Sequence, residues 1–222
     1  TDPEEMETVT ATSNSITLSG LTSNTQYNVF VKSVCSATDQ GPWSRMATFR
    51  TLCSAATIPW SEGFETLATG SSTSPAPECW ALLNANQGTY PYCYVNNTDT
   101  YVSEGTQSLY FVSNSAVYAY AILPPFDTPL NQLQISYKCN FESNTSSGYL
   151  TLGYMTNFMD ESTFVPLYTA ERLANKAFSV CEVLLDSVPT SAANARLAFR
   201  YGGGPSNNYY AGVDEGSVTM IP

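Results

Sequence analysis

The sequence predicts an all-β protein, with a short first domain followed by a larger two-sheet sandwich. Short segments in which apolar and polar side chains alternate recur along the 222 residues. Such alternation is typical of strands that bury one face. Turn residues separate the segments, and no helical pattern longer than two turns is present. Strands of this kind bury their apolar faces by stacking as two sheets.

The first domain is expected to span residues 1–53 and to contain three strands. The expected strands are 15–21, 26–34 and 45–51. Tyr27, Val29 and Val31 share one face of the second segment, because successive side chains of a strand point to opposite sides. Met46 and Phe49 are the apolar residues of the third segment.

The second domain is expected to span residues 54–222, beginning with a short linker at 54–59. Eight clear strands are expected within it, at 108–112, 116–123, 132–141, 149–155, 164–168, 178–185, 195–201 and 210–220. The segment 169–177 is rich in helix-forming residues, and we expect a short helix there within a loop.

Alternation also assigns faces to these strands. Arg196 and Arg200 are expected to face outward from the strand at 195–201. The side chains expected to face the core are Leu133, Ile135, Tyr137, Cys139, Phe141, Leu150, Leu152, Tyr154, Leu197, Phe199 and Tyr201.

Composition disfavours several classes of function. The net charge of −11 disfavours nucleic acids and anionic membrane surfaces as partners. The chain has no histidine, so Ser-His-Asp triads and His-ligated metal sites are excluded. No apolar run approaches the roughly 20 residues that span a bilayer. Because only 12% of the residues are charged and Ser, Thr, Asn and Tyr supply the polar surface, we expect an extracellular protein, secreted or at the cell surface.

Residues 21–27 resemble the tyrosine corner of fibronectin type III domains. Leu21 precedes a turn, and Thr25 and Tyr27 then open a strand. Trp43 and residues 48–51 are also similar to the end of that family's sandwich. The resemblance implies that the Tyr27 hydroxyl bonds back to the backbone. Because a complete domain has about 100 residues, we expect residues 1–53 to be its C-terminal part, with an uncovered edge suited to self-association.

The second domain resembles MAM-like and cleaved-adhesin jelly-roll modules. The motifs that carry this resemblance are Trp60-Ser61-Glu62-Gly63-Phe64-Glu65, Pro77-Glu78-Cys79-Trp80 and Gly212-Val213-Asp214. Segments at 105–111, 121–126 and 148–152 fit the family's strands in order. The resemblance implies that the first and last strands are neighbours and that the work of the module is adhesion or ligand binding, as in bacterial secreted or surface proteins.

A structural calcium site is one expectation from this arrangement. If the first and last strands are adjacent, Glu65 and Asp214 converge, and Asp99 is a third candidate ligand. Calcium prefers six to eight oxygen ligands, including carboxylates. The family's usual pair of Asp residues is replaced here by Asp214 and Glu215. The alternative is that Glu65 caps an edge and Asp214 closes a turn.

Two aromatic segments are candidates for sugar binding. Tyr90 and Tyr92 stand at alternate positions of one segment, with Tyr94 next in the same pattern. Asn207 and Tyr209 follow a glycine-rich stretch. Aromatic faces suit the apolar side of a sugar ring, and amides suit its hydroxyl groups. The alternative is that these tyrosines are ordinary strand residues.

The resemblance to MAM-type domains implies a disulfide between Cys53 and Cys79. Cys139 and Cys181 both fall on inward faces and are expected to be buried thiols. Cys35 and Cys53 lie at opposite ends of one hairpin, so we expect them not to pair.

These observations predict a protein that is not an enzyme. The 19 acidic residues include no pair whose spacing selects it for general acid–base catalysis. The expected function is non-catalytic adhesion or ligand binding, with a glycan or a host or matrix protein as the partner. Two alternatives remain open: a carbohydrate-binding accessory domain of a secreted hydrolase, and a structural spacer.

Overall fold

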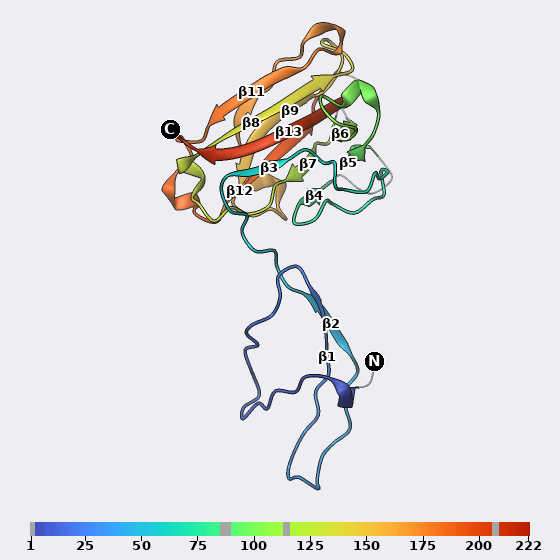
Figure 1. Ribbon diagram of the computed structural model, residues 1–222, viewed down its shortest axis with the longest axis vertical. Coiled ribbons are helices and arrows are strands. Elements are labelled where there is room, and N and C mark those ends of the chain that lie inside the picture. The colour runs from blue at the N-terminus through green and yellow to red at the C-terminus, as the bar shows by residue number, and fades with distance from the viewer. Residues whose placement is uncertain (1–2, 85–89, 113–115, 206–208) are drawn as a thin grey trace. The chain divides into compact units, whose positions relative to one another are not determined.

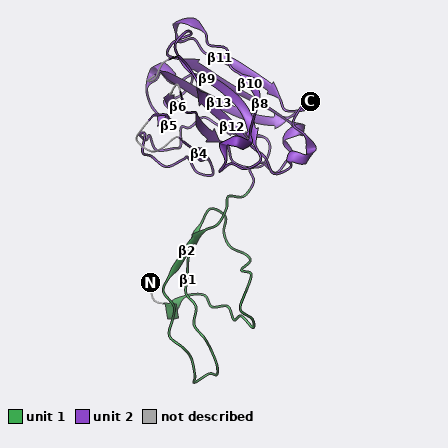
Figure 2. Cartoon of the chain, turned by 180° about the vertical axis from the view of Figure 1, so that it is seen from behind, with its two compact units in different colours: residues 1–54 green, residues 55–222 purple. Residues whose placement is uncertain are grey.

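The computed structural model describes residues 3–84, 90–112, 116–205 and 209–222 of the chain (Figure 1). The chain divides into two compact units, Thr1–Ser54 and Ala55–Pro222, which Figure 2 shows in separate colours. Within the described residues, none of the helices has the length and apolar character needed to cross a membrane.

The first unit contains a short 3-10 helix, η1 (Pro3–Glu5), and one two-stranded antiparallel sheet. Its strands are β1 (Gln26–Val29) and β2 (Ala47–Arg50). Tyr27 and Phe49 are directly opposite in this sheet, and their rings stack with centroids 5.7 Å apart. No described residue of this unit is buried.

The expected strand at 15–21 does not form. A strand exists only where a neighbour accepts and donates its hydrogen bonds, and β1 and β2 pair only with each other. The other two strands are shorter than expected for the same reason. The backbone N–H of Thr22 does donate a 2.8 Å hydrogen bond to the Tyr27 hydroxyl, as the tyrosine corner implies. The assignment of this unit to the fibronectin type III family stays a prediction.

The second unit is a sandwich of two antiparallel sheets, which confirms the predicted fold class. One sheet has the order β10-β9-β12-β7-β4, and the other has the order β11-β8-β13-β6-β5, with β3 also paired to β13. The strands are β3 (Trp60–Glu62), β4 (Ala81–Leu83), β5 (Tyr92–Asn96), β6 (Ser108–Val112), β7 (Ala119–Ile122), β8 (Leu133–Phe141), β9 (Tyr149–Met155), β10 (Phe164–Thr169), β11 (Ser179–Leu184), β12 (Arg196–Gly202) and β13 (Tyr210–Met220).

The connections carry short 3-10 helices. These are η2 (Asp99–Tyr101), η3 (Leu130–Gln132), η4 (Glu161–Thr163), η5 (Ala174–Lys176) and η6 (Thr190–Ala192). The helix expected at 169–177 is therefore reduced to the single turn η5. The backbone at Asn175 and Lys176 has positive φ angles of 58° and 56°, which an α-helix does not allow.

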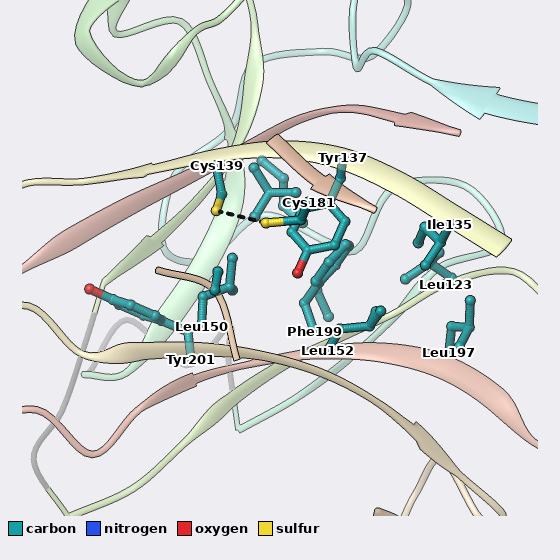
Figure 3. Packing of buried hydrophobic residues seen from close by; sticks show 14 of the residues in the cluster. Leu123, Ile135, Tyr137, Cys139, Leu150, Leu152, Cys181, Leu197, Phe199 and Tyr201 are labelled. Carbon is teal, nitrogen blue, oxygen red and sulfur yellow. Dashed lines mark hydrogen bonds between the residues drawn. The ribbon is translucent and has the colours of Figure 1, made fainter. Parts of the chain in front are cut away.

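The core lies between the two sheets, and Figure 3 shows its centre. Every side chain predicted to face inward is buried, from Leu133 at 0% exposed to Tyr154 at 7%. The rings of Tyr137 on β8 and Phe199 on β12 meet edge to face, with centroids 4.9 Å apart, so the two sheets interlock through aromatic contacts.

The first and last strands of the sandwich are neighbours, as predicted. β3 pairs antiparallel with β13, which places Glu62 opposite Gly216 and Trp60 opposite Val218. β13, red in Figure 1, thus runs between β8 on one side and β3 and β6 on the other. The aromatic residues of the sequence motifs also meet, since the Trp80 ring lies 6.2 Å from Trp60 and 5.8 Å from Phe64.

Candidate ligand-binding face

A cluster of tyrosines covers one corner of the outer face of the six-stranded sheet. Their neighbours in sequence, such as Cys93 and Phe111, point into the core, so alternation turns the tyrosines outward. They come from the approach to β5, from β5 itself, and from η2, β6 and β13. We call this set the tyrosine cluster: Tyr90, Tyr92, Tyr94, Tyr101, Tyr110 and Tyr210.

Three of these tyrosines form a stacked row along the sheet edge. The ring centroids of Tyr90 and Tyr92 are 5.1 Å apart, and those of Tyr92 and Tyr94 are 5.9 Å apart. The ring planes are nearly parallel, with interplanar angles of 22° and 26°. Such offset stacking is a favourable arrangement of aromatic rings.

The inner part of the cluster is packed more closely. Tyr110 stacks on Tyr210 at 5.3 Å and meets Tyr94 edge to face at 5.5 Å. Tyr101 meets Tyr110 edge to face at 5.0 Å. Exposure falls from 43% at Tyr90 to 8% at Tyr110 and 4% at Tyr101. The cluster therefore has a fixed base and an exposed end at Tyr90.

An ion pair anchors the base of the cluster. The Tyr101 hydroxyl donates a hydrogen bond to Glu142, whose other carboxylate oxygen lies 2.9 Å from Lys176 Nζ. Burial alone would raise the pKa of Glu142, but the bonds from Lys176 and Tyr101 hold that pKa below its usual value. Burial raises the pKa of the Tyr101 hydroxyl, so this group stays protonated and continues to donate.

A side-chain amide adjoins the stacked row. Asn96 Nδ2 lies 3.5 Å from the Tyr94 hydroxyl, and Asn96 Oδ1 accepts a 2.6 Å hydrogen bond from the Thr98 backbone N–H. Burial also raises the pKa of Tyr92, so its hydroxyl is neutral at physiological pH. The cluster thus offers aromatic surface, neutral hydroxyl groups and an amide in one place.

Only some of the predicted binding residues lie in the tyrosine cluster. Tyr90 and Tyr92 lie in the stacked row. Tyr209 precedes β13, and its backbone carbonyl accepts a 3.3 Å hydrogen bond from the Tyr201 hydroxyl. Within the described part of the chain, no ring contact involves Tyr209. Asn207 lies outside the described residues. Whether these residues bind a ligand stays a prediction.

Three members of the cluster were absent from the sequence prediction: Tyr101, Tyr110 and Tyr210. The alternation in β6 and β13 turns Tyr110 and Tyr210 outward, so this signal was present in the sequence. Tyr101 carried no such signal, because it reaches the sheet face from η2 rather than from a strand.

Glu65 and Asp214, two of the predicted calcium ligands, bind the same loop at residues 103–107. The Glu65 carboxylate accepts hydrogen bonds from the backbone N–H groups of Thr106 at 2.9 Å and Gln107 at 2.8 Å. The fully buried Asp214 accepts from the N–H groups of Ser103 at 2.8 Å and Glu104 at 3.2 Å.

The two carboxyl groups titrate differently. The hydrogen bonds from Thr106 lower the pKa of Glu65, and burial raises the pKa of Asp214. The third predicted ligand, Asp99, is exposed at the start of η2. Among the described residues, no group of three or more acidic or cysteine side chains converges on one point. Calcium binding by these acids stays a prediction, to be tested by melting the protein in calcium and in EDTA.

Four cysteines carry free thiols: Cys35, Cys93, Cys139 and Cys181. Cys139 and Cys181 are buried, and their sulfur atoms are 3.9 Å apart. Figure 3 shows the two side chains pointing toward each other. Cys53 and Cys79 are each disulfide-bonded. Because one belongs to each unit, the pairing of Cys53 with Cys79 stays a prediction.

Comparison with known proteins defines the class of this fold. No protein-family model matches the sequence, and no curated protein does. Among solved structures, the K1 cleaved adhesin domain of Lys-gingipain from Porphyromonas gingivalis matches with a TM-score of 0.55 and 18% identity, over 74% of this chain and 99% of that one. The K2 domain of Lys-gingipain matches with a TM-score of 0.56 and 15% identity, over 73% and 100% of the two chains.

A match also exists to an arabinose-bound α-L-arabinofuranosidase, with a TM-score of 0.51 and 16% identity. It covers 71% of this chain and only 25% of that enzyme. Each of these matches covers more of the chain than the first unit contains, so each must include the second, larger unit. That unit is therefore a jelly-roll β-sandwich. More particularly, it has the fold of the cleaved adhesin domains of Lys-gingipain.

Proposed function

We propose that this chain is a non-catalytic binding module, secreted or displayed at a cell surface, and that the tyrosine cluster is its glycan-binding face. The observation that supports this most is the stacked row of Tyr90, Tyr92 and Tyr94, which ends in a ring that is 43% exposed. The shared fold with domains named as adhesins supports attachment as the role. The absence of histidine and the low charge of the sequence support an extracellular, non-catalytic protein.

The geometry of the row limits how a sugar fits. Because the rings stack on one another, each inner ring has its faces covered and presents its edge and hydroxyl group. Flat aromatic surface is thus most exposed at Tyr90, the end of the row. A sugar ring places its C–H groups on such a surface, while neighbouring hydroxyl and amide groups bind its hydroxyls. This arrangement favours one or two sugar units rather than a long chain.

The test is binding to a glycan array, followed by titration of any glycan that binds. We expect Tyr90→Ala to weaken binding by up to about tenfold, since an aromatic contact contributes about 0.5–1.5 kcal/mol. Tyr92→Ala should weaken binding as well, because the Tyr90 ring stacks on Tyr92. Tyr149→Ala is the matched control, because Tyr149 is 44% exposed but lies on β9 in the other sheet.

Each outcome has a clear meaning. Loss of binding in the cluster variants but not in Tyr149→Ala supports the proposal. Equal binding by all variants removes the tyrosine cluster as the site. An array without any bound glycan removes glycan binding. Host or matrix proteins then become the partners to test by surface capture, and failure there leaves the spacer role.

A further inference from the structure

A second aromatic cluster lies on the outer face of the five-stranded sheet. Its buried members are Tyr120, Ile122, Met155 and Ala198, and half-buried rings of Tyr118, Phe158 and Phe164 pack against them. Arg196 and Arg200 stand at alternate positions of β12, between these rings, while Leu197 and Phe199 face the core. The outward direction predicted for the two arginines is correct, but both are half-buried because the rings cover them.

Arg196 has a structural role. Its guanidinium donates hydrogen bonds to the carbonyl oxygens of Leu123 at 2.7 Å and Cys79 at 2.8 Å. It also lies over the Phe158 ring, 4.8 Å from the centroid. Burial lowers the pKa of Arg196 to about 10, so it remains charged at neutral pH. These contacts hold β12 against the segments that contain Leu123 and Cys79.

Arg200 is held differently, between two aromatic rings. Its guanidinium carbon lies 4.6 Å from the centroid of Tyr118 and 4.5 Å from that of Phe164. Tyr120 is also close to Arg200: burial raises the pKa of the Tyr120 hydroxyl, and the charge of Arg200 opposes that rise. Arg200 Nε, by contrast, is buried and has no hydrogen-bond partner among the described residues.

Arg200 differs from the other positively charged side chains of this unit in the partners that it contacts. Lys138 and Lys176 form ion pairs with Glu215 and Glu142. Arg172 donates to the Ser147 carbonyl at 2.5 Å, and Arg196 donates to carbonyls as described above. In the described parts of the chain, neither a carboxylate nor a carbonyl oxygen accepts a hydrogen bond from Arg200, although acidic residues outnumber basic ones in the sequence, 19 to 8.

The rings on either side of Arg200 are fixed in place by close approach to glycine backbone. A Cβ atom at Gly153 would lie 2.5 Å from Phe164 Cζ, and one at Gly203 would lie 2.6 Å from the Tyr118 hydroxyl oxygen. Each ring therefore occupies space that a larger residue would fill, so Gly153 and Gly203 are required for the positions of the two rings. A preformed site of this kind loses little entropy when it binds a ligand.

The chemistry of such a group selects its ligand. The guanidinium carbon lies over the Tyr118 and Phe164 rings, so the N–H groups, which lie in the guanidinium plane, are the part that would bind a ligand. That edge matches the two oxygens of a carboxylate. A half-buried charge without a counterion is costly, so a ligand carboxylate would offset this cost as well as bind.

The position on the sheet separates sugar from peptide ligands. β12 is paired on both sides, with β7 and β9, so its backbone groups are used in the sheet and cannot bind an extended peptide. A ligand must therefore bind through side chains: the guanidinium, the Tyr118 hydroxyl and the Phe164 ring, since Tyr120 is only 3% exposed. A sugar ring that carries a carboxylate provides matching groups for all three kinds of contact.

We propose that Arg200, Tyr118 and Phe164, with the buried Tyr120 beside them, form a second binding site, which takes a uronic acid unit of an acidic glycan. This site, the Arg200 site, lies on a different sheet from the tyrosine cluster, and it does not depend on that cluster binding a ligand.

The experiment is calorimetric titration of the full chain with trigalacturonate and with its methyl ester. We expect trigalacturonate to bind about tenfold more tightly than the ester, since one charge-assisted contact is lost, and to bind more weakly as salt rises. Arg200→Gln should weaken trigalacturonate binding about tenfold, and Arg200→Lys should weaken it less, because charge remains without the planar fork.

Two controls make the assignment specific. Arg172→Gln also removes an arginine stacked on an exposed tyrosine, 4.2 Å from the Tyr149 centroid, and should bind as the wild type does. Tyr92→Ala changes the tyrosine cluster and should likewise leave trigalacturonate binding unchanged. Melting temperatures establish that each variant is folded. If Arg200→Gln does not fold, the methyl ester and Arg200→Lys decide the question.

Four results with the galacturonate ligands and the variants would overturn the proposal. They are absence of trigalacturonate binding, equal binding of acid and ester, full binding by folded Arg200→Gln, and loss of binding in Tyr92→Ala. A tetraglutamate peptide is titrated alongside. If it binds as tightly as trigalacturonate, the site recognises acidic peptides and the assignment to a sugar is wrong.

Discussion

Glu65 and Asp214 show how two carboxyl groups that bind the same loop can have pKa values shifted in opposite directions. Both carboxylates accept backbone N–H groups from the loop at 103–107. Glu65 is exposed, and the hydrogen bonds from Thr106 lower its pKa. Asp214 is buried, and burial raises its pKa despite its three hydrogen bonds. The pKa of each group therefore reports its degree of burial as much as its partners.

The pH dependence of stability should reveal the role of Glu65. Because its folded-state pKa lies below the unfolded value, its stabilising effect is complete above the ordinary carboxyl pKa and is lost as pH falls through the lowered value. Glu65→Gln should therefore melt at a lower temperature than the wild type at neutral pH, and this difference should shrink in acid. Melting curves over a pH series measure it, with Glu182→Gln, an exposed acid on β11, as the control.

A difference that stays constant over the whole pH series would contradict this account of Glu65. It would mean that the hydrogen bonds to Thr106 and Gln107, and not the charge on the carboxylate, carry the whole effect.

The roles of these acids also mark a limit of sequence analysis at the level of residues. The motifs single out Glu65 and Asp214, but their partners lie 41 and 111 positions away along the chain. Only folding brings those partners together. Gly105 is part of the same arrangement: its φ of +73° is strained for other residues, and a Cβ there would lie 2.5 Å from the Glu65 carboxyl carbon.

At the scale of elements, alternation predicts those strands that have a partner on each side or a face in the core. The predicted and observed bounds agree for β6, β9 and β13, which lie within their sheets. The same alternation at 15–21 produced no strand, because no neighbouring strand pairs with it. The tyrosine cluster was predictable only in part. The alternation in β5 indicated Tyr92 and Tyr94, whereas Tyr101 comes from η2, a segment without periodicity.

Gly212 on β13 should be required for η2 to lie on the sheet. A Cβ at this position would lie 2.5 Å from the Tyr101 carbonyl oxygen and 2.8 Å from Tyr101 Cβ. Gly212→Ala must displace η2, and we expect it to destabilise the protein by about 1–3 kcal/mol, the usual cost of overpacking. It should also weaken any glycan that binds the tyrosine cluster, because Tyr101 forms the base of that cluster.

Urea denaturation measures the change in stability. Gly63→Ala is the matched control, since no atom lies within 4 Å of a Cβ at Gly63. Wild-type stability in Gly212→Ala would show that η2 shifts without cost, so that its contact with the sheet does not fix Tyr101.

At the scale of the whole molecule, burial is divided unequally between the two units. The residues of the second unit form a continuous core between two sheets, whereas no described residue of the first unit is buried. Several large apolar side chains of the first unit are exposed: Val9, Ile16, Leu18, Val31, Val34, Met46, Phe49 and Leu52. A two-stranded sheet without a packed face is marginally stable in water, so the second unit carries the stability of the chain.

We expect this exposed apolar surface to make the full chain self-associate through its first unit. Sedimentation velocity should show association that increases with concentration for the full chain, whereas a fragment of residues 55–222 should remain monomeric and melt at the same temperature. Both proteins carry Cys79→Ser, and the full chain also carries Cys53→Ser, so that the predicted disulfide is absent from both. In the full chain, Val31→Ser should weaken association because burial of one such side chain contributes about 1.5–3 kcal/mol.

Val180→Ser on β11 is the control, since Val180 is 64% exposed and Val31 is 65% exposed. Association of the 55–222 fragment, or an equal effect of both substitutions, would place the contact on the sandwich instead of the first unit.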